Sequence, residues 1–276
     1  KKLERKLGQS AQKLGAIMNE ESAAYISDIK AEDLRLGQTL EHISESTGFP
    51  ILKNGTSKYY PFGEDMFRDM CEDLKNAKKY IYVEYFLIQS GKFWDSLTEI
   101  MAQKVEEGVD VRVMYDDLGS IGTYSVSNIV ALSKKGIKCI PFNPFLFVKS
   151  QLNNRDHRKI MVIDGNTAFT GGINFADRYI NRETVHGHWK DTAVMLKGKA
   201  VKGFTLMFLQ MWNISEKEPE FEPFLSFPSL PPENAEGFVI PYGDCPLDGD
   251  KVGEMVYMDI LNRAKNYVHI MTPYLI

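Results

Sequence analysis

Apolar positions in the first half of the chain fall into two kinds of segment, short β-branched or aromatic runs and longer amphipathic stretches. A short continuous apolar run is typical of a strand covered on both faces, whereas apolar residues three and four apart predict a helix. Strands are expected at residues 80–88, 109–115 and 137–142, and helices at 64–78, 93–107 and 125–134. Three successive strand–helix steps indicate parallel strands with right-handed crossovers.

A further β-branched run, KIMVI, begins at Lys159 and ends at Asp164-Gly165. Asp-Gly between apolar segments is a strong hairpin signal, so the TAF that follows is expected to form the return strand. Side chains alternate along a strand, so His157 and Lys159 share one face and Asp164 lies on the other. Burying a histidine and a lysine without partners is costly, and a phosphate between them would satisfy both.

These residue types suit phosphate chemistry. The lysine would neutralise charge, and the imidazole could attack phosphorus or transfer a proton. Gly171-Gly172 would let the backbone approach a ligand, and the Asn174 amide could donate to a phosphate oxygen. The alternative is a core histidine with satisfied hydrogen bonds, since His-x-Lys-x4-Asp alone is short enough to occur by chance. The glycine and asparagine that follow at fixed spacing favour a site.

At these residues the chain resembles the phospholipase D superfamily, whose signature is His-x-Lys-x4-Asp-x6-Gly-Ser-x-Asn. The matching positions are His157, Lys159, Asp164, Gly171 and Asn174. The chain departs from the signature at Gly172, where many members have serine. The flanking Asn-x-Asp-His-Arg-Lys and Phe-Ala-Asp-x-Tyr residues resemble the bacterial cardiolipin synthase branch.

The resemblance implies a phosphodiester site that uses neither a metal nor another cofactor. Trp189-x-Asp191 matches the position of an acid that holds the catalytic imidazole, and an ordinary strand-start aspartate is the alternative. The predicted catalytic residues are His157, Lys159, Asp164, Asn174 and Asp191, and the predicted substrate-binding residues are Gly171, Gly172 and Arg155. Because Asp164 lies on the opposite strand face, its expected role is structural, or polar at the turn.

Two other acidic positions leave alternatives open. Glu84 interrupts an apolar run, and a buried carboxylate there could support the site or pair with a lysine or arginine. Asp116-Asp117 end a predicted strand, and capping of the following loop is favoured over a metal site.

Residues 252–276 repeat features of residues 65–89. Four identical pairs stand 187 positions apart, namely Leu74 and Leu261, Ala77 and Ala264, Lys78 and Lys265, and Tyr80 and Tyr267. Both copies predict a helix followed by an apolar strand. The superfamily resemblance implies two His-x-Lys clusters facing each other across a pseudo-twofold axis. His157 would form a phosphohistidine, and a second histidine would protonate the leaving alcohol and deprotonate the incoming one.

The expected fold is therefore α/β: a phospholipase D-like lobe with a mixed, mostly parallel sheet, helices on both faces and the start of a second pseudo-symmetric lobe. Four segments are expected: an N-terminal helical, juxtamembrane segment (1–58), the first lobe (59–214), a linker (215–235) and a truncated start of the second lobe (236–276). Both chain ends look cut.

Charge and hydropathy limit the partners. A net charge of −4 gives no overall basic field, so no nucleic acid partner is expected. No apolar run is long enough to span a bilayer. The resemblance implies the bacterial cell membrane, with this chain as a soluble, cytoplasmic-side portion that meets the membrane surface. The aromatic run at residues 141–148 would contact lipid or pack on the core.

The resemblance implies a phosphatidyltransferase that makes cardiolipin from two phosphatidylglycerols and releases glycerol, with phosphatidylglycerol or another anionic phospholipid as substrate. The alternatives are a phospholipase D or nuclease that uses water as acceptor, and a non-catalytic lipid-binding fragment. The portion present could be inactive alone, or could pair as a homodimer.

Overall fold

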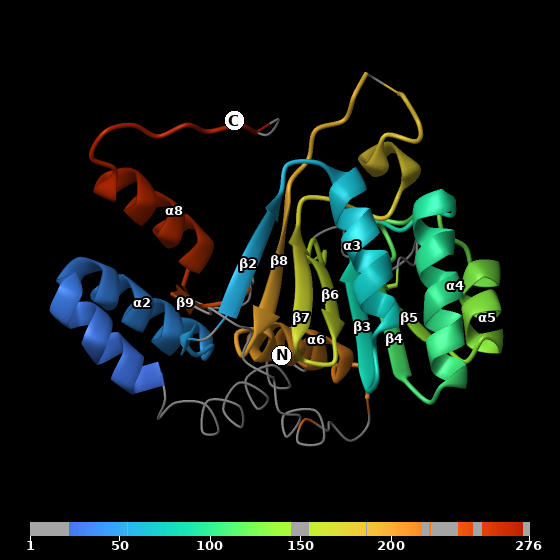
Figure 1. Ribbon diagram of the computed structural model, residues 1–276, viewed down its shortest axis with the longest axis horizontal. Coiled ribbons are helices and arrows are strands. Elements are labelled where there is room, and N and C mark those ends of the chain that lie inside the picture. The colour runs from blue at the N-terminus through green and yellow to red at the C-terminus, as the bar shows by residue number, and fades with distance from the viewer. Residues whose placement is uncertain are drawn as a thin grey trace. The chain divides into compact units, whose positions relative to one another are not determined.

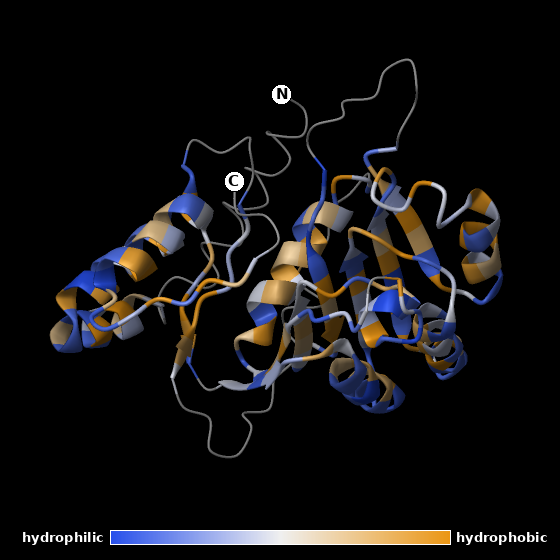
Figure 2. Cartoon of the chain, turned by 90° about the horizontal axis from the view of Figure 1, so that it is seen from above, coloured by the Kyte–Doolittle hydropathy of each residue, from blue (hydrophilic) through white to orange (hydrophobic). Residues whose placement is uncertain are grey.

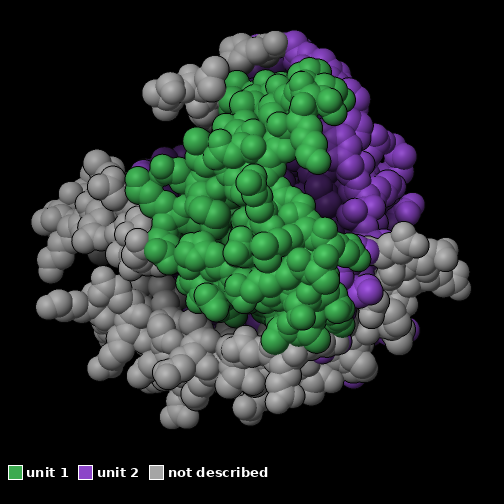
Figure 3. Space-filling model, turned by 90° about the vertical axis from the view of Figure 1, so that its left-hand side faces the viewer, with its two compact units in different colours: residues 1–51, 240–276 green, residues 52–239 purple. Residues whose placement is uncertain are grey.

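The structure, a computed structural model, divides into two compact units (Figure 3), which are described separately. The smaller unit joins residues 1–51 to residues 240–276, and the larger unit is formed by residues 52–239. The described residues are 22–53, 55–144, 155–185, 187–216, 221, 237–244 and 250–272.

The larger unit contains a seven-stranded sheet among its described residues (Figure 1). Its strands are β2 (Gly55–Tyr60), β3 (Tyr80–Tyr85), β4 (Asp110–Asp116), β5 (Lys138–Phe142), β6 (Lys159–Ile163), β7 (Thr167–Gly171) and β8 (Ala193–Gly198). Its helices are α3 (Gly63–Lys75), α4 (Lys92–Glu106), α5 (Val126–Lys134), the 3-10 helix η1 (Asp177–Ile180) and α6 (Val201–Trp212). The strands and helices predicted between residues 64 and 142 are confirmed, with small shifts at their ends.

The sheet is mixed, and the prediction that it is mostly parallel is wrong. Its order is β2-β8-β7-β6-β3-β4-β5. Only β3–β4 and β4–β5 are parallel, and the other four neighbouring pairs are antiparallel. The strand–helix steps fix direction from β3 to β5 alone. After β5 the chain returns to the opposite side of β3, where β6 pairs antiparallel and opens a run of antiparallel neighbours.

Helices cover both faces of the sheet, as predicted. Alternate β3 residues such as Ile81 and Val83 are fully buried in a core that also contains α3 and α4 residues such as Met70 and Leu97. The other β3 face packs on α6, where the Tyr82 ring stacks on a phenylalanine with centroids 4.6 Å apart. Figure 2 shows the resulting concentration of hydrophobic residues along the strands and the inner helix faces.

The hairpin predicted at Asp164-Gly165 joins β6 to β7. Both residues have positive φ, 54° and 64°, as a tight turn requires. The Asp164 carboxylate accepts the backbone N–H groups of Lys78, Lys79 and Tyr80 at 2.7–3.0 Å. The turn is thereby fastened to the start of β3.

Strand β5 lies at one edge of the sheet and contains Pro141, which is paired in register with Tyr115 of β4. Proline lacks a backbone N–H and is confined to edge strands, so this position suits it. Residues 145–148 of the predicted aromatic loop lie outside the described residues.

The smaller unit is helical where it is described. Residues 22–32 form a helix, followed by α2 (Leu34–Thr47), and α8 (Val252–Arg263) packs on α2. Asp33 caps α2 by accepting the Leu36 N–H at 3.0 Å and forms a 2.6 Å ion pair with Arg263. None of the helices in the described ranges is both long and apolar enough to cross a bilayer.

The strand expected from the internal repeat does not form at residues 267–272, which lie outside any helix or strand. A strand is held by hydrogen bonds to a neighbour, and no strand within the described residues pairs with this segment. A short pair, β1 (Leu52–Lys53) and β9 (Phe238–Val239), forms instead at the two ends of the larger unit. Residues 1–21, and residues 217–220 and 222–235 of the linker predicted at 215–235, lie outside the described residues.

Candidate active site

Strand directions bring most of the predicted site residues to one edge of the sheet. Because β6 runs antiparallel to β3, its start lies beside the end of β3, with Lys159 opposite Tyr85. The end of β7 lies beside the start of β8, with Gly171 opposite Ala193. This shared edge is at the top of the sheet in Figure 1. Ligands in open α/β sheets commonly bind outside the carboxyl ends of parallel strands, which is where β3 and β4 end.

Lys159 is a buried cation, only 5% exposed. Its ammonium donates to the His157 carbonyl oxygen at 2.6 Å and lies over the Phe86 ring, 5.3 Å from the centroid. Burial lowers the pKa of Lys159 to about 8, against the opposing charges of Asp156 and Asp191. No ion pair to this ammonium is formed within the described residues. An incoming anion would therefore meet a cation whose charge is only partly balanced.

His157 is exposed, and its ring meets Phe86 edge to face with centroids 4.6 Å apart. Partial burial, and then the Lys159 charge, lower the pKa of this imidazole, while Asp156 and Asp116 raise it. A lowered pKa favours the neutral imidazole near pH 7, and the neutral ring is the form that can attack phosphorus.

Asp191 lies two residues before β8. Its Oδ1 atom accepts the Thr192 N–H at 2.8 Å, and its charge acts on the Lys159 ammonium. Within the described residues no hydrogen bond joins Asp191 to His157. Its expected role in holding the imidazole stays a prediction.

Neighbouring protein atoms leave little room for a side chain at Gly171 or Gly172. Gly171 has φ 151°, and a Cβ there would lie 2.5 Å from the Thr192 carbonyl oxygen. A Cβ at Gly172 would lie 2.2 Å from Asp191 Oδ1, in the place where many superfamily members carry serine. Their expected close approach is thus to β8 and Asp191, and contact with a substrate stays a prediction.

Three further predicted residues are held in place by contacts within the protein. The buried Asn174 amide accepts the Leu87 N–H at 3.2 Å and donates to the Tyr179 hydroxyl at 3.0 Å. Asp164 fastens the hairpin, as described above, away from the shared edge. Arg155 forms a 3.3 Å ion pair with Asp116 and donates to the Asn143 carbonyl oxygen at 3.0 Å. The phosphate contact of Asn174 and the substrate contact of Arg155 stay predictions.

Three acids lie beneath the His157 segment, and of these the sequence drew attention to Glu84 and Asp116 but not to Asp156. Asp116 accepts the Gly119 N–H, which is the favoured capping role, and also the Asp156 N–H at 2.9 Å. Glu84 pairs with Arg158 at 3.4 Å, so the residue that interrupts the apolar run contacts the motif itself. Alternation along the strand puts Asp156 and Arg158 on one face, and this was the available signal for Asp156.

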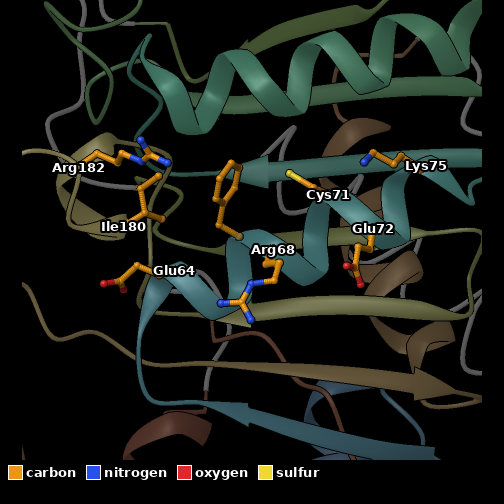
Figure 4. Close-up of a pocket in the computed structure, with 8 residues that line it drawn as sticks. Glu64, Arg68, Cys71, Glu72, Lys75, Ile180 and Arg182 are labelled. Atoms are coloured by element: carbon orange, nitrogen blue, oxygen red, sulfur yellow. The ribbon is translucent and has the colours of Figure 1, made fainter.

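A surface pocket of about 400 Å³ lies elsewhere, along α3. Figure 4 shows Arg68, Cys71 and Lys75 of α3 lining it, together with Ile180 and Arg182. It contains none of the predicted site residues, so the shared sheet edge remains the candidate site.

Comparison with known proteins agrees with the motif. Residues 70–212 match the family described as cardiolipin synthase, PLD-like domain. The chain belongs to this family. It is 32% identical over 218 residues to a cardiolipin synthase of Geobacillus thermodenitrificans, covering 78% of this chain and 43% of that protein. It is 35% identical over 217 residues to cardiolipin synthase 2 of Bacillus anthracis, covering 78% and 42%.

A more similar relative is an uncharacterized protein of Streptococcus mutans, 49% identical over 249 residues, with 90% of this chain and 54% of the relative covered. The chain thus spans about half the length of the curated relatives that it matches. A solved phospholipase D family member, Nuc from Salmonella typhimurium, aligns with a TM-score of 0.45 and 18% identity over 59% of this chain and 95% of its own.

Proposed function

We propose that this chain carries the first catalytic lobe of a phosphatidyltransferase that makes cardiolipin. The enzyme would transfer a phosphatidyl group from one phosphatidylglycerol to a hydroxyl of another and release glycerol. The supporting observation is the pairing of an exposed imidazole with a buried ammonium at one sheet edge, in a chain of the cardiolipin synthase family. Association with the bacterial membrane and with anionic phospholipid is part of the same proposal.

In the first step an imidazole nitrogen of His157 forms a bond to phosphorus, and the phosphorus–oxygen bond to glycerol breaks. The leaving oxygen takes a proton from a general acid. In the second step the hydroxyl of another phosphatidylglycerol loses its proton and attacks phosphorus. The phosphorus–nitrogen bond then breaks, which restores the imidazole. The Lys159 ammonium would stabilise the phosphate oxygens in both steps, where a preorganised charge in a dry site is most effective.

One histidine cannot be nucleophile and general acid in the same step. A second cluster, from the rest of the protein or from another copy, would supply the acid. Asp191 would support the imidazole, and Asn174 and Gly172 would contact the phosphate.

The test is incubation of the full-length protein with phosphatidylglycerol vesicles. Cardiolipin and glycerol support transfer, whereas phosphatidic acid supports hydrolysis and contradicts the proposal. His157→Ala should lower the rate by about 10³-fold or more, as expected for loss of a nucleophile. His188→Ala is a matched control, because His188 is 58% exposed and pairs with Glu64. Phosphate trapped covalently on His157 would exclude a binding module.

A further inference from the structure

Three acidic side chains lie together beneath the segment that carries His157. We name Glu84, Asp116 and Asp156 the carboxyl cluster; their exposed fractions are 0%, 0% and 4%. They come from β3, from the end of β4 and from the residue just before His157. Carboxylates buried to this degree need hydrogen-bond donors or cations.

Asp116 is well supplied with donors. One of its oxygens accepts the Gly119 N–H at 2.9 Å and faces Arg155 at 3.3 Å, and the other accepts the Asp156 N–H at 2.9 Å. In each of the other two acids, only one carboxyl oxygen contacts a hydrogen-bond donor. Asp156 Oδ1 accepts the Arg158 N–H at 3.1 Å, and Glu84 Oε1 faces the Arg158 guanidinium at 3.4 Å.

Two carboxyl oxygens, Glu84 Oε2 and Asp156 Oδ2, are therefore left without a hydrogen-bond donor in the described part of the chain. Both are buried, and neither meets an N–H or O–H donor within the described residues. Both side chains contact Arg158, Glu84 at its guanidinium and Asp156 at its backbone N–H, and a side-chain hydrogen bond to Asp156 is among the causes that raise the pKa of Glu84. Two ionised carboxylates in this arrangement repel, whereas one proton between them turns two unsatisfied acceptors into one hydrogen bond.

We propose that Glu84 is a neutral acid whose O–H donates to Asp156, so that Asp156 remains as a single anion fixed beside His157. The ion pairs leave Asp156 as the acid that keeps its charge. Asp116 faces the guanidinium of Arg155 and Glu84 faces that of Arg158, whereas Asp156 accepts the Arg158 backbone N–H. Burial, and then the Asp156 charge, raise the pKa of Glu84 well above its usual range, against the smaller opposing effect of Arg158.

The proposal gives Asp156 a positioning role toward His157. The backbone of Asp156 is held by Asp116 and its side chain by Glu84 and Arg158, so the residue before the imidazole is fixed on the opposite face. Asp156 and Asp116 are also the anions that raise the His157 pKa against burial and Lys159. Asp156 would thus add to the charge support that the resemblance assigns to Asp191.

The retained proton is tested by infrared spectroscopy of the full-length protein near neutral pH. The wild type should show the carbonyl stretch of a protonated carboxylic acid, which Glu84→Gln removes and Glu99→Gln retains. Glu99 is a matched control because it is an exposed position on α4. If Glu84→Gln does not fold, ¹³C labelling of glutamate in the wild type should shift the band. Absence of the band, or a band that neither change affects, would overturn the proposal.

The positioning role is tested on His157 by NMR titration of its ring protons. Asp156→Asn should lower the titration midpoint, because it removes a negative charge beside the ring. Glu84→Gln should leave the midpoint near the wild-type value, because its amide N–H can still donate to an ionised Asp156. An unchanged midpoint in Asp156→Asn would contradict the assigned role.

A rate measurement adds a third readout and rests on the proposed function. Glu84→Ala should lower phosphatidyl transfer about tenfold to a hundredfold, the range that a displaced catalytic group costs, and Glu84→Gln should restore most of the rate. Equal losses in both variants would contradict positioning through this hydrogen bond. The infrared and NMR readouts need no transfer activity, so failure of the proposed reaction would be distinguishable.

Discussion

Replacing Lys159 with methionine should stabilise the larger unit while removing phosphate binding. The pKa of Lys159 falls from 10.5 to about 8 on folding, mainly through burial. At about 1.4 kcal/mol per unit of pKa shift, keeping this lysine charged at pH 7 lowers the free energy of unfolding by about 3 kcal/mol. The lost hydrogen bond to the His157 carbonyl offsets about 1 kcal/mol of the gain. The expected net gain in unfolding free energy is therefore about 2 kcal/mol.

The pH dependence of the unfolding free energy gives a second test of the cost of burying the Lys159 charge. Between pH 8 and 10.5 the unfolded chain holds a proton on this lysine that the folded chain has released. Across this window the unfolding free energy of the wild type should therefore rise with pH relative to that of Lys159→Met.

Urea unfolding followed by tryptophan fluorescence measures both effects. The three tryptophans of the chain, Trp94, Trp189 and Trp212, all lie in the larger unit. Lys138→Met is the matched control, since Lys138 is 59% exposed and its ion pair with Asp110 contributes at most about 1 kcal/mol. A Lys159→Met variant that is less stable than the wild type at pH 7, or whose unfolding free energy has the same alkaline pH dependence as the wild type, would refute the reasoning.

Three further predictions concern the hairpin, the glycines and the imidazole. Asp164→Ala should cost about 2–4 kcal/mol in urea unfolding, because three backbone N–H groups lose their acceptor; a loss below about 0.5 kcal/mol would contradict this role. Gly171→Ala should cost about 2–4 kcal/mol because its Cβ would meet backbone atoms, whereas Gly172→Ser should cost less because its Cβ would meet the carboxylate of Asp191, which is the end of a side chain. The reverse order would count against this packing. The acid limb of the transfer rate should have its midpoint below pH 6.5, because the His157 pKa is lowered and the neutral ring is required; a midpoint above 6.5 would speak against a neutral nucleophile.

Local patterns predicted the strands and helices between residues 64 and 142, and the hairpin after Ile163. Strand polarity beyond β5 was not predictable in the same way. The pairing of β3 with β6 joins residues about 80 positions apart, such as Tyr82 and Val162, and no turn signal links them. Strand–helix steps determine the direction of consecutive strands only, so the antiparallel pairings other than the β6–β7 hairpin were missed.

The candidate site also contains residues that local sequence predicts and residues that only the fold brings together. His157 and Lys159 were predicted as site residues because their spacing matches a strand face and a known signature. Asp116 and Asp156 were missed as site residues because each resembles an ordinary polar residue at a strand end, and only the fold brings them together. Glu84 attracted attention because a charge inside an apolar run is unusual, although its partner Arg158 could not be read from that run.

Pro141 has a consequence for association of this protein with other chains. An exposed edge strand is a template onto which another strand can add, and such addition leads to aggregation. At β5 the proline removes one of the donors that an added strand would need. Growth of the sheet beyond this edge is therefore penalised, and a neighbouring chain would dock more readily through side chains than by prolonging the hydrogen-bonded ladder at β5.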